Sequence, residues 1–260
     1  MSSFFERLRL AARAHSSQLC VGLDPDPDRI PGGVDGAVRH CLEVVRQTRD
    51  LVCCFKPNSA FWEQYGGAGL DALRLIRERI PESVPVLYDA KRADLDHTNR
   101  AYARAAFDYL KMDAITLHPY LGSDGLSEFV ARSDKGCYVL CRTSNPGASE
   151  LQDRDSGGEA LYLRVARLAA TLNHAGNVGL VVGATAPEEV ARVRAASTLP
   201  FLIPGVGAQG GHLEASVAAA WNGDEASCLV NVSRSVLYAQ DPRAAAEGMR
   251  QAINKVLERL

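Results

Sequence analysis

The chain has 260 residues, a hydrophobic fraction of 47%, a charged fraction of 23% and a formal net charge of -2. These values are ordinary for a globular protein, and they argue against a basic surface that coats nucleic acid and against an acidic solvating tail. No apolar stretch approaches the roughly 18 residues that a membrane span requires. We therefore expect a globular protein that partners neither a nucleic acid nor a membrane.

The N-terminal residues 1–15, MSSFFERLRLAARAH, carry charges inside their apolar stretch and lack a small-residue cleavage site. This pattern predicts an amphipathic helix and not a signal peptide. The seven cysteines form no CxxC pair and show no spacing typical of a zinc site. We interpret the cysteines as small buried side chains in a reducing cytoplasm.

Eight short apolar runs then follow one another along the chain. They are rich in Val, Leu, Ile and Cys and do not alternate with polar residues, which is typical of strands buried on both faces. The runs are 18–24, 51–56, 84–91, 113–118, 137–142, 178–183, 199–204 and 228–233.

The segments between these runs have apolar residues at helical spacing. One helix is expected to stop at Pro81, one to end near Gly176 as a C-terminal cap, and one to carry Pro187 in its first turn. The predicted helical stretches are 34–50, 69–80, 158–176, 186–197, 214–221 and 241–260.

A strand followed by a helix, repeated eight times over residues 1–260, predicts an α/β protein built as a single (β/α)8 TIM barrel. An open doubly wound sheet is the alternative, and eight units favour closure. No composition break suggests a domain boundary. The one long polar stretch, 143–159, follows the fifth strand and is expected to be a lid, a binding loop or a disordered segment.

Charged side chains gather where the first three strands end. Asp24 follows the first strand, Lys56 ends the second, and Asp89, Lys91 and Asp94 lie at or just beyond the end of the third. In a barrel of this type the chemistry takes place at the C-terminal ends of the strands. Ammonium and carboxylate groups in close quarters hold each other ionised and can leave a lysine as a fixed positive charge or a proton donor. One charged residue at a strand end is usually part of an ordinary ion pair. Five such residues from three consecutive strands are harder to explain in that way and indicate a functional site.

The segment PGVGAQGG, residues 204–211, fits the pattern GxGxxG between a strand and a helix. A dinucleotide site would also need an acidic residue at the end of the next strand, and CLVNVS (228–233) supplies none. We therefore interpret the glycines as a backbone cradle for one phosphate, with Arg234 closing on the anion. A tight structural turn is the alternative.

Residues 88–98, YDAKRADLDHT, match the signature DxKxxD(I/L)xxT, and through it the chain resembles the orotidine 5′-phosphate decarboxylase family. FKPN after the second strand and TSNPG (143–147) after the fifth place the resemblance in a bacterial branch. The glycine segment and the pair Ser233–Arg234 also fall in the family's order. DxKxxD is shared with a wider suprafamily, whereas Lys56 together with Gln209 is more specific.

The resemblance implies conversion of orotidine 5′-phosphate to UMP and CO2, the last step of de novo UMP synthesis, in a homodimer with shared active sites. The sequence shows no thiamine motif and no convincing nicotinamide site, so we expect no cofactor, and we expect no metal ion. The resemblance also implies that Lys91 stabilises the C6 carbanion and protonates it. Lys56 would bind the ribose and Asp89, which itself would lie against the substrate carboxylate. The other implied contacts are Asp24 with the ribose, Asp94 and Thr98 with the partner's site, Thr143 and Ser144 with the pyrimidine, Gln209 with base and phosphate, and Arg234 with phosphate.

The chain differs from the usual family pattern at two positions, and two further residues lie at the barrel rim. Ser233 stands where many family members have Gly, and Leu95 replaces the commoner Ile. Asn58 is a candidate substrate contact. His118 either contacts the substrate or braces the rim.

Three other functions are compatible with a charged barrel rim. A magnesium-dependent keto-sugar-phosphate lyase of the same suprafamily would use Asp24, Asp89 and Asp94 as oxygen ligands, but Lys56 stands where those relatives carry an acidic residue. A Schiff-base aldolase would use Lys91. A non-catalytic barrel that binds a phosphate ligand would not need the complete charged set.

Overall fold

The computed structural model describes residues 2–185, 187–206 and 212–260, and its strands form one parallel eight-stranded sheet. The strand order is β2-β1-β8-β7-β6-β5-β4-β3. The strands are β1 (Leu19–Gly22), β2 (Cys54–Lys56), β3 (Leu87–Arg92), β4 (Ala114–Leu117), β5 (Gly136–Arg142), β6 (Val178–Val182), β7 (Phe201–Ile203) and β8 (Cys228–Val232).

The two outer strands of this order meet, so the sheet curls into a nearly closed barrel. Parallel bridges join Phe55 to Val86 and Asn58 to Asp89, and the N–H of Asp89 donates to the Pro57 carbonyl at 2.9 Å. The predicted TIM barrel is confirmed, and the open doubly wound sheet is not the fold.

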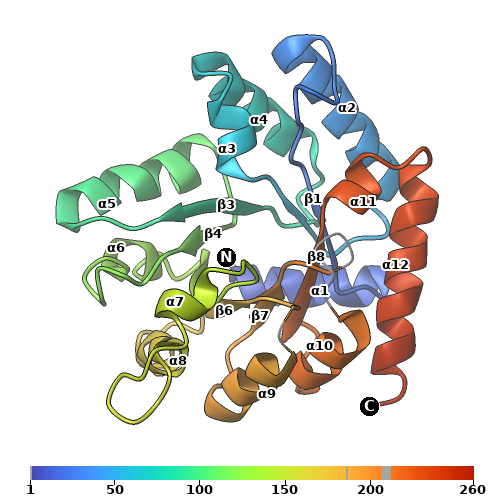
Figure 1. The fold of residues 1–260 in the computed structure, drawn as a ribbon. Helices are drawn as coiled ribbons and strands as arrows, with labels where there is room; N and C mark the ends of the chain where they lie inside the picture. The colour runs from blue at the N-terminus through green and yellow to red at the C-terminus, as the bar shows by residue number, and fades with distance from the viewer. Residues whose placement is uncertain (1, 186, 207–211) are drawn as a thin grey trace.

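Helices surround the strands, as Figure 1 shows. The longer ones are α2 (Gly33–Thr48), α4 (Gly67–Arg79), α5 (Asp96–Ala103), which continues into the π-helix η1 (Arg104–Tyr109), α8 (Leu161–Thr171), α9 (Pro187–Ala196), α10 (Leu213–Ala220) and α12 (Pro242–Leu257). Short helices follow several strands: α3 (Ser59–Glu63), α6 (Ser127–Val130), α7 (Ala148–Leu151) and α11 (Arg234–Leu237).

The N-terminal helix α1 (Phe4–His15) lies across the far end of the barrel in Figure 1. It begins with a capping box, in which the Ser3 hydroxyl accepts from the N–H of Glu6 and the Glu6 carboxylate accepts from the N–H of Ser3. The rings of Phe4 and Phe5 pack edge-on against Tyr138 of β5 inside the barrel. Helix α1 therefore fills the N-terminal end and leaves the opposite end for a site.

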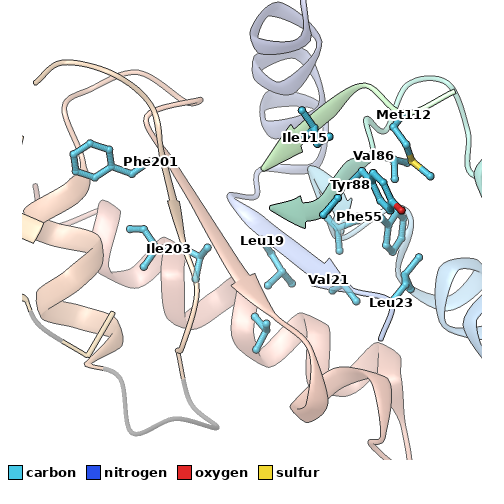
Figure 2. Close-up of a cluster of buried hydrophobic side chains, with 14 of the residues drawn as sticks. Leu19, Val21, Leu23, Phe55, Val86, Tyr88, Met112, Ile115, Phe201 and Ile203 are labelled. Atoms are coloured by element: carbon cyan, nitrogen blue, oxygen red, sulfur yellow. The ribbon is translucent and has the colours of Figure 1, made fainter. Parts of the chain in front are cut away.

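A second hydrophobic layer lies between the sheet and the surrounding helices. Figure 2 shows part of this layer, with Leu19 and Val21 on β1 near Phe55 of β2 and Tyr88 of β3. These side chains point outward while their neighbours in the chain point into the barrel, because side chains alternate along a strand. Lys56 and Asp89, each next in sequence to one of these residues, therefore face inward.

The predicted elements are present, with bounds that differ from the predicted ones by a few residues; most are shorter, whereas β5 and α4 are slightly longer. The predicted helices 158–176 and 241–260 are observed as α8 and α12, and the short helices after β2, β4, β5 and β8 were not expected. The polar stretch 143–159 contains α7. All seven cysteines are free and buried, as predicted. Among the described residues, no helix is long and apolar enough to span a bilayer.

Candidate active site

A cavity of about 870 Å³ opens at the C-terminal ends of the strands. It collects residues from seven of the eight strands or the loops that follow them. Eight of the eleven predicted site residues line it: Asp24, Lys56, Asn58, Asp89, Lys91, Thr143, Ser144 and Arg234.

A row of three alternating charges crosses the cavity between β2 and β3. Lys56 Nζ lies 2.6 Å from Asp89 Oδ2, and Lys91 Nζ lies 2.7 Å from Asp89 Oδ1. The Lys56 side chain is 4% exposed and the Lys91 side chain 48% exposed. Lys56 is therefore a buried support for the carboxylate, and Lys91 is the ammonium that a ligand in the cavity can reach.

The charges of this row keep one another ionised. Burial on its own would lower the pKa of the Lys56 ammonium, but the negative charges of Asp89 and Asp24 outweigh burial and hold that pKa above its usual value. Burial would likewise raise the pKa of the Asp89 carboxyl, but the charges and hydrogen bonds of Lys56 and Lys91 hold that pKa below its usual value. The site therefore carries fixed charges at neutral pH.

The backbone of β3 is irregular at Lys91. Tyr88 pairs with Ile115 and Arg92 with Leu117, so three β3 residues face the single β4 residue Thr116. Lys91 has a φ of 46°, a left-handed conformation that costs a non-glycine residue about 1–3 kcal/mol. A bulge of this kind redirects a side chain, and here it accompanies the ammonium that points into the cavity.

Asp24 is held from two sides. Its Oδ2 accepts the hydroxyl proton of Ser233 at 2.7 Å, and its Oδ1 accepts from the backbone N–H of Asn58 at 2.9 Å. The Asn58 side chain donates to Asp89 Oδ2 at 3.3 Å and accepts from the N–H of Ala60, the second residue of α3. Ser233, the departure from the family's usual glycine, is thus an anchor for a predicted site residue.

The loop after β5 brings a further amide to the cavity. The N–H of Thr143 donates to Gln152 Oε1 at 2.8 Å, and Gln152 Nε2 donates to the Thr143 hydroxyl at 2.8 Å. The carbonyl of Ser144 accepts from the Thr185 hydroxyl at 3.3 Å. The two residues predicted to read a pyrimidine edge are therefore braced, Thr143 by Gln152 just after α7 and the Ser144 backbone by Thr185 in the loop after β6.

Two arginines, one after β1 and one after β8 in the chain, line another part of the cavity. Arg234 begins α11 and lines the cavity beside Gly205. The Arg29 guanidinium lies over the Tyr238 ring, 3.8 Å from its centroid, and Tyr238 is one turn after Arg234. Neither guanidinium is ion-paired with a carboxylate of the described residues. Gln209, predicted to bridge base and phosphate, lies outside the described residues.

Asp94 and Thr98 are not among the described residues that line this cavity. The Asp94 carboxylate accepts from the N–H of Leu95 at 2.7 Å, and Asn99 accepts from the N–H of Asp94. His118 also lies outside the lining, and its Nε2 is 3.2 Å from the Ala93 carbonyl, which fits the bracing role. The chain alone does not bring Asp94 and Thr98 to its own row of charges.

Sequence reasoning missed several residues of this site. Asn231 on β8 lines the cavity and is 8% exposed, and a polar residue inside the apolar run CLVNVS was a usable signal. Thr116, within the apolar run 113–118, gave a weaker signal of the same kind. Arg29, Gln152 and Tyr238 come from loops or helix ends, where no periodicity marks a position.

Comparisons with known proteins agree with this geometry. The sequence matches the family model described as "Orotidine 5'-phosphate decarboxylase / HUMPS family" over residues 17–249. It is 50% identical to the orotidine 5'-phosphate decarboxylase of Thermomicrobium roseum, with 98% of this chain and 93% of that protein covered, and 49% identical to that of Roseiflexus castenholzii, with 98% of each covered. The solved structure of Leishmania donovani OMP decarboxylase matches with a TM-score of 0.91 and 44% identity over 98% of both chains.

Proposed function

The chain belongs to the orotidine 5′-phosphate decarboxylase / HUMPS family, and from this premise we propose that it is a carboxy-lyase that converts orotidine 5′-phosphate to UMP and CO2. The observation that carries the proposal is the row Lys56–Asp89–Lys91, with its half-exposed ammonium facing the cavity. A buried carboxylate flanked by two ammonium groups suits a substrate whose own carboxylate leaves as CO2.

The reaction breaks the bond between C6 and the carboxyl carbon and leaves the electron pair on C6. That pair lies in the ring plane without simple π-delocalisation, so nearby fixed charge must stabilise it. The Lys91 ammonium supplies this charge and then transfers a proton from Nζ to C6, giving UMP, after which water reprotonates the amine. This route requires no electron-sink cofactor.

Other lining residues hold the substrate. Asp24, fixed by Ser233 and the Asn58 amide, binds a ribose hydroxyl, and Arg234 binds the phosphate with its planar guanidinium. The phosphate is remote from C6, so its binding energy can organise the site around the base. The remaining contacts of the proposal are Asn58 with the substrate, Thr143 and Ser144 with the pyrimidine, and Gln209 with base and phosphate.

The magnesium-dependent lyase is not favoured. Both oxygens of Asp89 are engaged by lysine ammonium groups. Within the described part of the chain, no His, Cys, Asp and Glu residues form a group of three or more that could hold a metal ion, so Asp24, Asp89 and Asp94 do not converge as that reaction would need.

We also propose a homodimer in which Asp94 and Thr98 complete the partner's active site. Support comes from their position outside their own cavity and from exposed apolar side chains in the same region, including Leu95 at 56% and Tyr120 at 80%. Asn99 donates to the carbonyls of Asp94 and Gly125, which ties the two loops into one surface. A C₂ pairing of this surface would give two composite sites.

The proposal includes a cytoplasmic location, a single catalytic domain over residues 1–260 and no nucleic-acid partner. Seven reduced, buried cysteines suit a reducing compartment, and a net charge of -2 does not favour phosphate-backbone binding.

The decisive experiment is to add orotidine 5′-phosphate to the purified protein in the presence of EDTA and to follow the absorbance of the pyrimidine. We expect a loss of absorbance with stoichiometric formation of UMP and CO2. Absence of turnover would contradict the proposal, and turnover of a keto-sugar phosphate that EDTA abolishes would favour the magnesium-dependent lyase.

A further inference from the structure

Thr116 on β4 holds the two charged residues of β3 at once. Its hydroxyl oxygen is 3.0 Å from the backbone nitrogen of Lys91 and 2.9 Å from Asp89 Oδ1. The Lys91 N–H can only donate and the ionised Asp89 carboxylate can only accept. The single hydroxyl proton must therefore point to Asp89, and the hydroxyl oxygen accepts from Lys91.

This hydroxyl occupies a position that no other described group fills. Thr116 is the one β4 residue opposite the three-residue stretch 89–91 of β3, where the regular ladder is interrupted. The N–H of Lys91 therefore finds a side-chain oxygen in place of a strand carbonyl. Thr116 is only 1% exposed, so water does not readily replace the bond.

From this geometry we propose that Thr116 is a positioning residue, which keeps Lys91 in its left-handed conformation and its ammonium at the reacting carbon. The inference rests on the proposed decarboxylase function. Thr116 is not among the described residues that line the cavity, so it acts through Lys91 and Asp89 and not by contact with substrate. Its loss should therefore affect the chemical step more than substrate binding.

The test compares three variants of the full-length protein. Thr116→Val keeps the branched shape and removes the hydroxyl, and Thr116→Ser keeps the hydroxyl. Thr48→Val is the matched control, because Thr48 is equally buried and its hydroxyl donates to the Val44 carbonyl within α2, away from the cavity.

We expect Thr116→Val to lower kcat roughly 10- to 100-fold, the effect of misplacing a catalytic group by about 1 Å, with KM within about threefold of wild type. Thr116→Ser should restore kcat to within about threefold, and Thr48→Val should leave kcat unchanged. A normal kcat for Thr116→Val overturns the inference, and so does an equal loss in Thr116→Ser.

A second measurement does not depend on the substrate. Hydrogen exchange at the Lys91 amide should be faster in Thr116→Val than in wild type and unchanged in Thr48→Val. An unchanged Lys91 amide in Thr116→Val overturns the inference. If wild type fails to consume orotidine 5′-phosphate while this exchange difference appears, the proposed function fails and the positioning of Lys91 by Thr116 stands.

Discussion

Lys91 Nζ lies 2.7 Å from Oδ1 of Asp89, two residues earlier on the same strand. Residues two apart on a regular strand share a face but stand apart along it. Here the bulge and the positive φ of Lys91 bring the two charged ends together. The ion pair is thus formed by an irregular backbone, and backbone strain of this kind commonly occurs at functional sites.

Replacing Lys91 separates its chemical role from its backbone strain. Lys91→Ala and Lys91→Gly should both lower kcat by about 10³-fold or more, because proton donor and cation are lost together. Lys91→Gly should nevertheless be more stable than Lys91→Ala by about 1 kcal/mol, since glycine adopts a φ of 46° without a Cβ clash. Single-turnover kinetics and urea unfolding measure the two effects. A kcat of Lys91→Ala within tenfold of wild type would rule out its assigned role.

The barrel and most of its charged rim were predictable because they depend on patterns within short segments. Eight apolar runs marked the strands, and the end of each run showed which side chains would meet at one rim. The bulge at Lys91 was not predictable, because it depends on how β3 pairs with β4, and a single hydroxyl at Thr116 inside an apolar strand carries little signal.

The contacts made by loop residues could not be predicted from the sequence, for a different reason. Gln152 reaches Thr143 only because α7 folds the chain back after β5, and a four-residue helix is too short to show a helical period. Arg29 joins the cavity by stacking on Tyr238, more than two hundred positions away in the sequence. Such contacts are set by tertiary packing and not by local sequence.

The raised pKa of Lys56 and the lowered pKa of Asp89 predict a wide pH range of constant charge. A carboxylate with a lowered pKa stabilises the fold above its ordinary value, near 3.9, and loses that contribution as pH falls through the folded-state value. A lysine with a raised pKa contributes below about 10.4 and loses its contribution at higher pH. Neither group should therefore titrate between about pH 5 and 9.

Carbon-13 NMR of the Asp89 carboxyl in the wild-type protein, recorded across pH, checks this expectation. The carboxyl resonance should stay constant from about pH 5 to 9 and should shift only below about pH 4. A shift centred near pH 6 or 7 would show that the Asp89 carboxyl titrates in the physiological range, contrary to the geometry.

Arg234→Ala should raise KM and also slow turnover, because phosphate binding helps to organise the site. Loss of a hydrogen bond to a charged group predicts a fall in kcat/KM of roughly 10- to 100-fold. Arg243→Ala is the control, since Arg243 pairs with Asp50 outside this cavity. Phosphite should accelerate wild-type turnover of a substrate that lacks the phosphate, and no acceleration would argue against organisation of the site by the phosphate.

Mixed dimers test the shared active site. Lys91 lines the cavity of its own chain, whereas Asp94 does not, so the dimer proposal assigns the two residues of one site to different chains. Lys91→Ala and Asp94→Ala homodimers should each be nearly inactive. In a mixed dimer, one site carries both defects, and the other combines the intact Lys91 of one chain with the intact Asp94 of its partner.

Subunit exchange between equal amounts of the two variants should therefore restore activity. Random exchange makes half of the dimers mixed, and each mixed dimer has one intact site of two, so about a quarter of wild-type activity is expected. Native mass spectrometry of differently tagged chains measures the extent of exchange, and each variant incubated alone is the control. If exchange is complete and no activity returns, Asp94 acts within its own chain, and the exposed surface around Leu95 and Tyr120 has to be explained without a shared site.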